Sequence, residues 1–507
     1  MLITGLDYPD PDVIRVNDIY YMVTTTMHFM PGCEILQSKD LVHWEHLTYV
    51  YDVLDGTKAQ SLQDGKNIYG KGMWAASLRY HQGVFYICFA ANDTGKTYLF
   101  RTNDLQGRWV RSQIQGFYHD SSLLFDDDRV YIVYGNRDIY ITELASDLSG
   151  PKEGGLHRML ISDQGNPNLG YEGSHIYKIN GKYYLFCIHS KRECWRRVEA
   201  CFYAKTLEDE FVGQDIFDED MGYCHQGIAQ GGIVDTPTGE WYAVLFQDRG
   251  AVGRIPVLVE VLWENEFPVM RLPKQLPNEC TEYNALCGSD DFIYPPVADL
   301  KEIDQQYGCY GLKSMWQFNH APDLSAITVD QQKGVLSIRT VDVCNELTQA
   351  KNILTQRMRY PGCSGEITLD VSRLRDGDYA GLSIFQEDYA MIAVTKRQEA
   401  YYIVMQTKGE IVEEIPIEGK QKVTLKAMAD FSHMKDVSTF YYLEHGQWKQ
   451  IGKEHKLHFS LAHFTGCRFG LFYYATKEIG GKVDFMNFIY KTMEDIYGKF
   501  IKETVMP

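Results

Sequence analysis

The most constraining feature of this sequence is an aromatic segment that recurs five times in its first half. Each copy alternates aromatic and aliphatic residues after a polar or glycine-containing turn, which indicates the second strand of a β-hairpin. Successive copies begin about 45 to 65 residues apart, and helical periodicity is nearly absent between them. The copies are residues 18–22, 83–87, 129–133, 181–185 and 239–243.

A second tag follows most copies of the aromatic segment. It reads Ser-Lys-Asp-Leu at 38–41 with Trp44, and it returns in altered form at 102–105, 145–148 and 205–207. Each unit therefore holds about four strands, too few to bury both of its faces. Five such units reach a common core by packing radially around an axis, so we predict a five-bladed β-propeller. A sandwich of some twenty strands is the alternative, although a sandwich does not need this repeat.

The repeat also predicts which residues meet at the propeller axis. The first strand of each blade lines the central channel, and the residue that opens this strand faces one mouth of the channel. Three of the five positions carry a carboxylate, which is disfavoured in strands and is costly where like charges converge. Taken singly, each would also fit a turn, a loop cap or an exposed strand end. Counting back about ten residues from each aromatic pair reaches Asp10, Ala75, Asp120, Glu172 or Gly173, and Gln230 or Gly231.

Three converging carboxylates suit the hydrolysis of a glycosidic bond. This reaction needs a protonated acid on the leaving oxygen and an ionised carboxylate on the other side of the sugar. A third carboxylate can tune the pKa of the acid and hold the sugar. The shared register of the three residues therefore favours a hydrolytic site over three unrelated structural roles.

The residues around these positions resemble glycoside hydrolase family 43, five-bladed propeller enzymes that act on xylans, arabinans and related pentose polymers. The resemblance implies an inverting mechanism in which Asp10 is the general base, Glu172 the general acid, and Asp120 modulates the pKa of the acid and orients it. Asp12 and Asp7 are alternatives to Asp10, which the Asp-Pro motif of the family selects. The resemblance runs from about residue 5 to 270 and rests on 8–12, 20–22, 38–45, 73–75, 119–120, 172–173 and 253–256.

The same resemblance implies a set of substrate-binding residues. Phe29 and Trp74 would wall an apolar sugar pocket, because aromatic faces cover the C–H surface of a sugar. Arg254 would donate hydrogen bonds to sugar hydroxyls. Core packing of the two aromatic residues and a structural ion pair of Arg254 are the alternatives.

The fifth blade departs from the family pattern. Gln230 stands where many members place an axial histidine, often beside a bound calcium ion or water. A glutamine carbonyl can ligate calcium, so Gln230 is a substrate-binding candidate and calcium in the channel stays open, with His225 as a second ligand candidate. The reaction itself requires no cofactor, and we assign no metal-binding residues.

The second half of the chain has a different pattern. After residue 270 a proline-containing stretch and Tyr294-Pro-Pro296 indicate a linker. Strands with period-2 alternation then follow, and they resemble the carboxy-terminal sandwich of two-domain, xylosidase-like members, which packs on the propeller and shapes the site entrance. We predict a catalytic propeller over 1–285 and a jelly-roll, lectin-like β-sandwich over 286–507, the linker included. A free-standing carbohydrate-binding module is the alternative. The expected strands include 334–339, 365–371, 379–385, 400–405, 439–443 and 469–474.

The amino-acid composition limits the kinds of partner that the chain is expected to bind. The chain carries 50 basic and 68 acidic residues, a net charge of −18, which disfavours nucleic acid and anionic membranes. No stretch approaches the roughly 20 apolar residues that span a bilayer, and the first residues lack the pattern of a signal peptide. We therefore expect a cytoplasmic protein. Its 12 cysteines are scattered, as reduced core thiols are.

Together these features predict an exo-acting, inverting glycosidase that releases terminal α-L-arabinofuranose or β-D-xylose from oligosaccharides derived from xylan or arabinoxylan. The Gln230 variant favours arabinofuranose slightly, by resemblance only. The alternatives are a non-catalytic carbohydrate-binding propeller, a related propeller enzyme such as an arabinan-degrading hydrolase, and a phosphorylase-type propeller. Homo-oligomerisation stays open.

Overall fold

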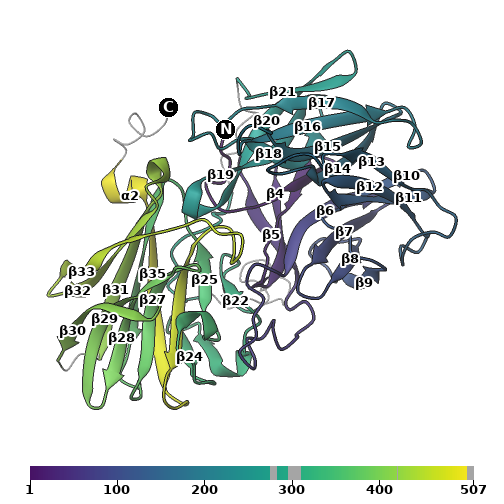
Figure 1. Cartoon of the computed structure of the whole chain (residues 1–507). Helices are drawn as coiled ribbons and strands as arrows, with labels where there is room; N and C mark the ends of the chain where they lie inside the picture. The colour runs from purple at the N-terminus through teal and green to yellow at the C-terminus, as the bar shows by residue number, and fades with distance from the viewer. Residues whose placement is uncertain (275–282, 295–309, 419–420, 499–507) are drawn as a thin grey trace.

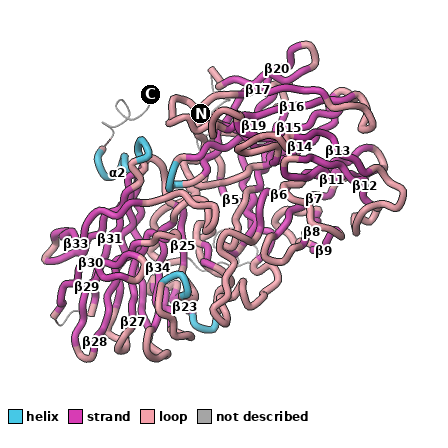
Figure 2. The backbone as a smooth tube through the Cα atoms, in the orientation of Figure 1, coloured by secondary structure: helices cyan, strands magenta, loops and turns pink. Residues whose placement is uncertain are grey.

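The computed structural model describes residues 1–274, 283–294, 310–418 and 421–498, and these form two β domains that lie side by side (Figure 1). Figure 2 shows strands throughout both domains. In the described residues, helix is limited to α2 (Met493–Tyr497) and four 3-10 turns. The predicted fold class, a five-bladed propeller followed by a sandwich, is confirmed. Part of the expected linker, including Pro277 and Pro296, lies outside the described residues.

The propeller consists of five antiparallel sheets of four strands each. The sheet orders are β1-β2-β4-β5, β6-β7-β8-β9, β10-β11-β12-β13, β14-β15-β16-β17 and β18-β19-β20-β21, so the chain builds one blade after another. The strands are β1 (Asp12–Val16), β2 (Ile19–Val23), β4 (Gly32–Ser38), β5 (Glu45–Tyr51), β6 (Met73–His81), β7 (Val84–Ala91), β8 (Lys96–Thr102), β9 (Val110–Ile114), β10 (Ser122–Asp126), β11 (Arg129–Asn136), β12 (Asp138–Leu144), β13 (His157–Ser162), β14 (Glu172–Ile179), β15 (Lys182–Ser190), β16 (Arg197–Ala204), β17 (Val212–Phe217), β18 (Ile228–Asp235), β19 (Trp241–Asp248), β20 (Arg254–Glu264) and β21 (Phe267–Arg271).

The five predicted aromatic segments are the second strands of the blades, namely β2, β7, β11, β15 and β19. Their side chains pack with the neighbouring strands, as where Phe89 stacks on Tyr98 and Phe100 in blade 2. The amino terminus closes the ring, because Leu2 bridges to Val257 in the last blade. The repeated aromatic segments therefore form part of the core of each blade, as predicted from the sequence.

The Ser-Lys-Asp-Leu tag is a turn between the third and fourth strands of a blade. The Asp40 carboxylate accepts hydrogen bonds from the backbone N–H groups of Val42 and His43, and the Trp44 indole donates to the Leu41 carbonyl. Short polar side chains favour such turns because they satisfy backbone donors locally. In blade 2, Trp109 donates to the Leu105 carbonyl in the same way, which explains why the tag recurs.

The second domain consists of two antiparallel sheets. The orders are β3-β22-β25-β34-β27-β28-β29-β30 and β23-β24-β35-β26-β31-β32-β33, and the six strands expected from the sequence are all present. Their alternating residues form the sandwich core. The strands are β3 (Phe29–Met30), β22 (Gln317–Asn319), β23 (Ile327–Asp330), β24 (Val335–Arg339), β25 (Leu354–Arg357), β26 (Gly362–Asp370), β27 (Asp378–Phe385), β28 (Ala390–Arg397), β29 (Ala400–Thr407), β30 (Glu410–Ile417), β31 (Lys422–Asp430), β32 (Val437–Glu444), β33 (Gln447–Lys456), β34 (Arg468–Ala475) and β35 (Lys482–Thr492).

The two domains are joined by a strand pairing and by a buried ion pair. Strand β3 lies in a loop of blade 1, yet it pairs with β22 of the sandwich. Arg357 of the sandwich is 2.7 Å from Glu34 of blade 1, and the two side chains are 3% and 2% exposed. The Arg357 guanidinium also donates to the Asp7 carbonyl at 2.8 Å. The sandwich is therefore built onto the propeller and is not a free-standing module.

Two further observations concern the cysteines and the helices. The ten cysteines of the described residues are all free thiols, and eight of them are buried. Among the described residues, no helix has the length and apolar character needed to cross a lipid bilayer.

Candidate active site

Each blade opens its first strand with a left-handed residue. The positive φ angles lie between 23° and 62° for the residues involved, and three of the five blades show a register shift of the ladder at this point. Such β-bulges re-aim side chains, and strained backbone of this kind clusters at functional sites. The five residues are Asp10, Ala75, Asp120, Gly173 and Gln230.

This ring corrects one detail of the sequence prediction. The in-register residue of blade 4 is Gly173, so Glu172 occupies the preceding position, as Trp74 does in blade 2 and His119 in blade 3. A side chain at Gly173 would collide with Gln230, because an added Cβ would lie 2.6 Å from the Gln230 side chain. Two carboxylates therefore belong to the left-handed ring, and Glu172 belongs to the residues just before it.

Asp10 is held by two donors. Its Oδ1 accepts from Arg254 Nη1 at 2.6 Å, and its Oδ2 accepts from the Thr25 hydroxyl at 2.7 Å. The Thr25 hydroxyl in turn accepts from the backbone N–H of Ala75 at 2.8 Å, so adjacent blades fix the orientation of the carboxylate. The side chains of Asp10 and Arg254 are 2% and 8% exposed.

Asp120 and Glu172 meet around His119. The His119 Nε2 atom is 3.7 Å from Asp120 Oδ1 and 3.7 Å from Glu172 Oε2. Asp120 raises the pKa of His119 to about 9, so the imidazole is charged at neutral pH. Burial, reinforced by the charges of Glu172 and Asp10, raises the pKa of Asp120 to about 6. Asn136 donates to Glu172 Oε2 at 2.6 Å.

A series of buried ion pairs extends from Arg254, the partner of Asp10. Arg254 Nε is 3.4 Å from Asp248 Oδ1, and Asp248 also pairs with Arg197. Both guanidinium groups lie near the ring of Phe246, at 4.5 Å for Arg254 and 5.6 Å for Arg197. The structure thus shows Arg254 as the ion-pair partner of Asp10 and Asp248, and its predicted contact with sugar hydroxyls stays a prediction.

The two alternatives to Asp10, namely Asp12 and Asp7, have other ion-pair and hydrogen-bond partners. Asp12 pairs with Arg79 at 2.6 Å inside the channel, and its side chain is fully buried. Asp7 accepts from the backbone N–H of Arg254 at 2.7 Å and from Thr465 and Gly466 of the sandwich at 2.5 and 3.0 Å. Of these three residues, Asp10 alone belongs to the ring at the mouth.

The two predicted aromatic walls differ in their surroundings. Phe29 is 2% exposed and packs against Phe464 and His28, with the Arg468 guanidinium 3.5 Å from its ring centroid. Phe29 therefore lies in the interdomain core, which corrects the expectation of an open aromatic wall: the sandwich covers it. Trp74 is half-buried at the mouth, and its indole N–H has no hydrogen-bond partner among the described residues.

Gln230 is buried, and its backbone N–H donates to Glu199 Oε2 at 2.7 Å. Glu199 Oε1 has no partner in the described part of the chain, and burial raises the pKa of this carboxyl to about 8. Calcium binds six to eight oxygen ligands, and Gln230 and Glu199 alone supply too few of them, so calcium in the channel stays a prediction. Ligand atoms of His119, Asp120 and Glu172 all lie within 4.8 Å of one another, a spacing that would also suit a metal ion.

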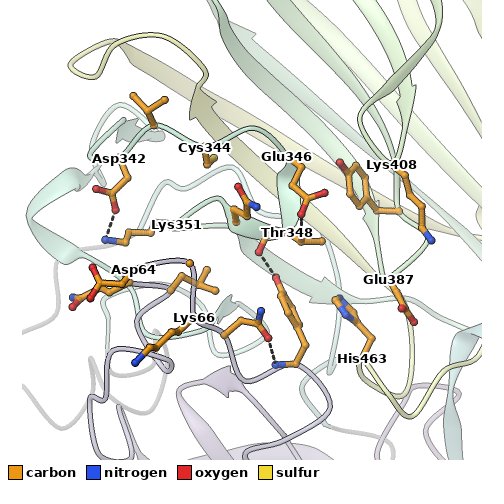
Figure 3. Close-up of a pocket in the computed structure, with 18 of the residues that line it drawn as sticks. Asp64, Lys66, Asp342, Cys344, Glu346, Thr348, Lys351, Glu387, Lys408 and His463 are labelled. Carbon is orange, nitrogen blue, oxygen red and sulfur yellow. Dashed lines mark hydrogen bonds and ion pairs between the residues drawn. The ribbon is translucent and has the colours of Figure 1, made fainter.

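A separate cavity of about 1100 Å³ lies between the domains (Figure 3). It is lined by charged residues of the connection between blades 1 and 2 and of the sandwich, and Lys351 pairs with Asp342 inside it. Its lining includes His463 and Tyr69, whose rings stack at 3.9 Å, but none of the three carboxylates of the mouth. We therefore place the chemistry at the propeller mouth and not in this cavity.

The sequence analysis missed several residues of the mouth. His119 was read only as part of a motif, and Asn136, Thr25 and Asp248 were not considered. Asn136 and Asp248 are the last residues of the second strands of blades 3 and 5. These strands run antiparallel to the first strands, so their ends face the same mouth, and counting forward from the aromatic segments would have found them.

The fold and the residues at the channel mouth together define the class of protein. A propeller that gathers three carboxylates, an arginine and a half-buried tryptophan at one end of its channel is suited to polarise and hydrolyse a glycosidic bond. Comparison with known proteins gives the family. Residues 3–268 match the family model for glycosyl hydrolases family 43, and residues 310–491 match the beta xylosidase C-terminal concanavalin A-like domain. The chain belongs to glycoside hydrolase family 43.

Individual relatives are consistent with this assignment. A putative beta-xylosidase of Xylanibacter ruminicola is 27% identical over 74% of this chain and 69% of its own length. A non-reducing end alpha-L-arabinofuranosidase of Bacteroides ovatus is 24% identical over 84% of this chain and 82% of its own. A solved structure of a bifunctional GH43-CE protein of Bacteroides eggerthii is 41% identical, with a TM-score of 0.88 over 96% of this chain. The present chain spans 63% of that protein, less than two thirds of its length.

Proposed function

We propose that this glycoside hydrolase is an inverting exo-glycosidase that releases terminal α-L-arabinofuranose or β-D-xylose from short oligosaccharides derived from xylan or arabinoxylan. The observation that carries the proposal is the division of the mouth into two sides. Asp10 is buried and paired with Arg254, whereas Glu172 is 20% exposed and contacts His119 and Asn136. This difference supports Asp10 as the base and Glu172 as the acid that a leaving group can reach.

The proposed reaction uses each group once. A water molecule gives a proton to Asp10 as its oxygen forms a bond to the anomeric carbon. The bond between that carbon and the leaving oxygen breaks, and Glu172 gives its proton to the leaving oxygen. Asp120 and His119 set the charge around Glu172, and Arg254 donates to sugar hydroxyls. The product sugar has the opposite anomeric configuration.

Exo action is supported by the sandwich. Its 460–467 segment packs on the propeller close to the sequence position of Asp10, where Phe464 packs on Phe29 at 5.2 Å and Thr465 donates to Asp7. We propose that this segment limits the approach to the site from one side, which would favour a terminal sugar over the middle of a chain. The names of relatives agree, since they include beta-xylosidases, a xylosidase/arabinosidase and a non-reducing end alpha-L-arabinofuranosidase.

The test is release of nitrophenol from aryl β-D-xyloside and aryl α-L-arabinofuranoside. We expect the native chain to hydrolyse at least one of them and Glu172→Gln and Asp10→Asn to lose at least about a hundredfold in kcat/KM. Asp127→Asn is the matched control, because Asp127 is an exposed carboxylate at a hairpin tip, and it should retain full activity. Activity on neither sugar, or full activity of both site variants, would contradict the proposal.

Inversion is tested separately by proton NMR of the first-formed sugar. A product of retained configuration would remove Asp10 from the role of base. We also propose that the reaction needs no metal, so dialysis against EDTA should leave kcat/KM unchanged. A loss that calcium restores would instead assign a metal to His119, Asp120 and Glu172 or to Gln230. The cytoplasmic location stays a prediction.

A further inference from the structure

Trp195 lies on the same rim of the propeller as Glu172, outside the machinery assigned so far. It belongs to the loop between β15 and β16, the second and third strands of blade 4. Glu172 opens the first strand and pairs with Ile188, and the next ladder rungs end where Ser190 pairs with Arg197. The loop that carries Trp195 therefore continues past the end of the ladder on the side of Glu172.

The base of this loop is firmly held. The Arg196 guanidinium is 2.5 Å from Asp218 and 2.6 Å from Asp220, and the Lys191 N–H donates to the Arg196 carbonyl at 3.0 Å. The indole of Trp195, in contrast, is 51% exposed. A single exposed apolar residue is ordinary on a protein surface, but here a fixed loop presents the largest side chain at the edge of a catalytic mouth.

Trp195 is also connected to the base side of the site. The Arg197 guanidinium lies 5.6 Å from the centroid of its ring and pairs with Asp248. Asp248 contacts Arg254, which pairs with Asp10. Three charged side chains thus lead from the indole to the proposed general base.

We propose that Trp195 is a specificity-determining residue that stacks on the sugar of the leaving group. This inference rests on the proposed function. Glu172 must reach the leaving oxygen to protonate it, so the leaving group lies toward blade 4, the blade that also carries Trp195. The apolar C–H face of a pyranose or furanose ring packs well on an indole face. Binding energy from this remote sugar helps to hold the scissile bond against Glu172.

The proposal predicts different effects of a Trp195 substitution on two kinds of substrate. A pentose oligosaccharide offers a sugar to Trp195, whereas a glycosyl fluoride of the same terminal sugar has a leaving group too small to stack. For Trp195→Ala we expect kcat/KM to fall about tenfold on the oligosaccharide and to stay within about twofold on the fluoride. Trp195→Phe should keep most of the oligosaccharide activity, because a planar apolar face remains.

Tyr80→Ala is the matched control. Tyr80 is 44% exposed and lies near the far end of β6, away from the mouth, so its removal should change neither rate. A native chain that hydrolyses neither substrate would refute the proposed function. A native chain that is active while Trp195→Ala loses nothing on the oligosaccharide, or loses equally on both substrates, would overturn the role of Trp195 and leave the function standing.

Discussion

Replacing His119 with glutamine should move the acid limb of the pH profile upward. In the native chain the imidazolium of His119 is 3.7 Å from one oxygen of Asp120 and stabilises its ionised form. The pKa of His119 is about 9 and that of Asp120 about 6, so the imidazole is charged throughout the range in which Asp120 ionises. Glutamine keeps a polar side chain at the mouth but removes the charge.

The magnitude follows from the distance and the exposure. Two unit charges about 4 Å apart attract by about 4 kcal/mol at an effective dielectric constant of 20. The His119 side chain is 36% exposed, so water screens the pair, and we retain about a third of this value. The remaining ~1.4 kcal/mol corresponds to about one pKa unit. The pKa of Asp120, about 6 in the native chain, should therefore rise by about one unit in His119→Gln, and an acid limb that follows the ionisation of Asp120 should move upward with it.

The assay is kcat/KM for the better aryl glycoside between pH 4.5 and 9, with circular dichroism to confirm that the variant is folded. His81→Gln is the control, because His81 lies at the far end of β6 and stacks on Phe125, away from the mouth. An acid limb that stays in place in a folded His119→Gln chain, or that moves downward, would refute the electrostatic reasoning.

Two further predictions concern stability. Because the folded chain raises the pKa of Asp120 from 3.8 to about 6, its carboxyl favours folding below about pH 4 and this contribution is lost as pH rises through 6. Asp120→Asn should thus be more stable than the native chain by about 1 to 3 kcal/mol at pH 7.5 but not at pH 4 in urea unfolding; lower stability at pH 7.5 would contradict this. Arg357→Met should cost about 3 to 5 kcal/mol, because it removes the arginine partner of the buried Glu34 and leaves that carboxylate with His46 alone. Calorimetry would show this as a lower Tm, which Glu34→Gln added to Arg357→Met should partly restore; an unchanged Tm would count against a buried pair.

Much of the propeller was predictable because a blade repeats local rules. The alternation of side chains fixes which residues of β2 or β11 face the core, and a hairpin fixes the distance from that strand back to the mouth. Asp10 and Asp120 were reached by this count alone. Glu172 needed the family resemblance as well, because ten residues before Tyr183 the count reaches Gly173, and Glu172 stands one position before that ring residue.

The interdomain contacts were not predictable in the same way. Strand β3 has two residues, too few for a periodic pattern, and it pairs with β22, nearly three hundred residues further along the chain. The burial of Phe29 follows from that pairing, so a residue that looked like a sugar contact became interdomain core. Asn136 is a single polar residue at a strand end, and only the fold shows that it reaches Glu172.

The position of Asp7 argues that the sandwich is part of the catalytic scaffold. One of its oxygens accepts from the backbone N–H of Arg254, and the other accepts from Thr465 and Gly466 of the sandwich. Asp7 stands three residues before Asp10, and Arg254 holds Asp10, so a shift of the sandwich segment would act on the chain next to Asp10 and on its partner Arg254. A domain that only bound sugar would not need contacts with Asp7. We therefore expect the sandwich to hold Asp10 in position, and separating the two domains should abolish activity even toward small aryl glycosides.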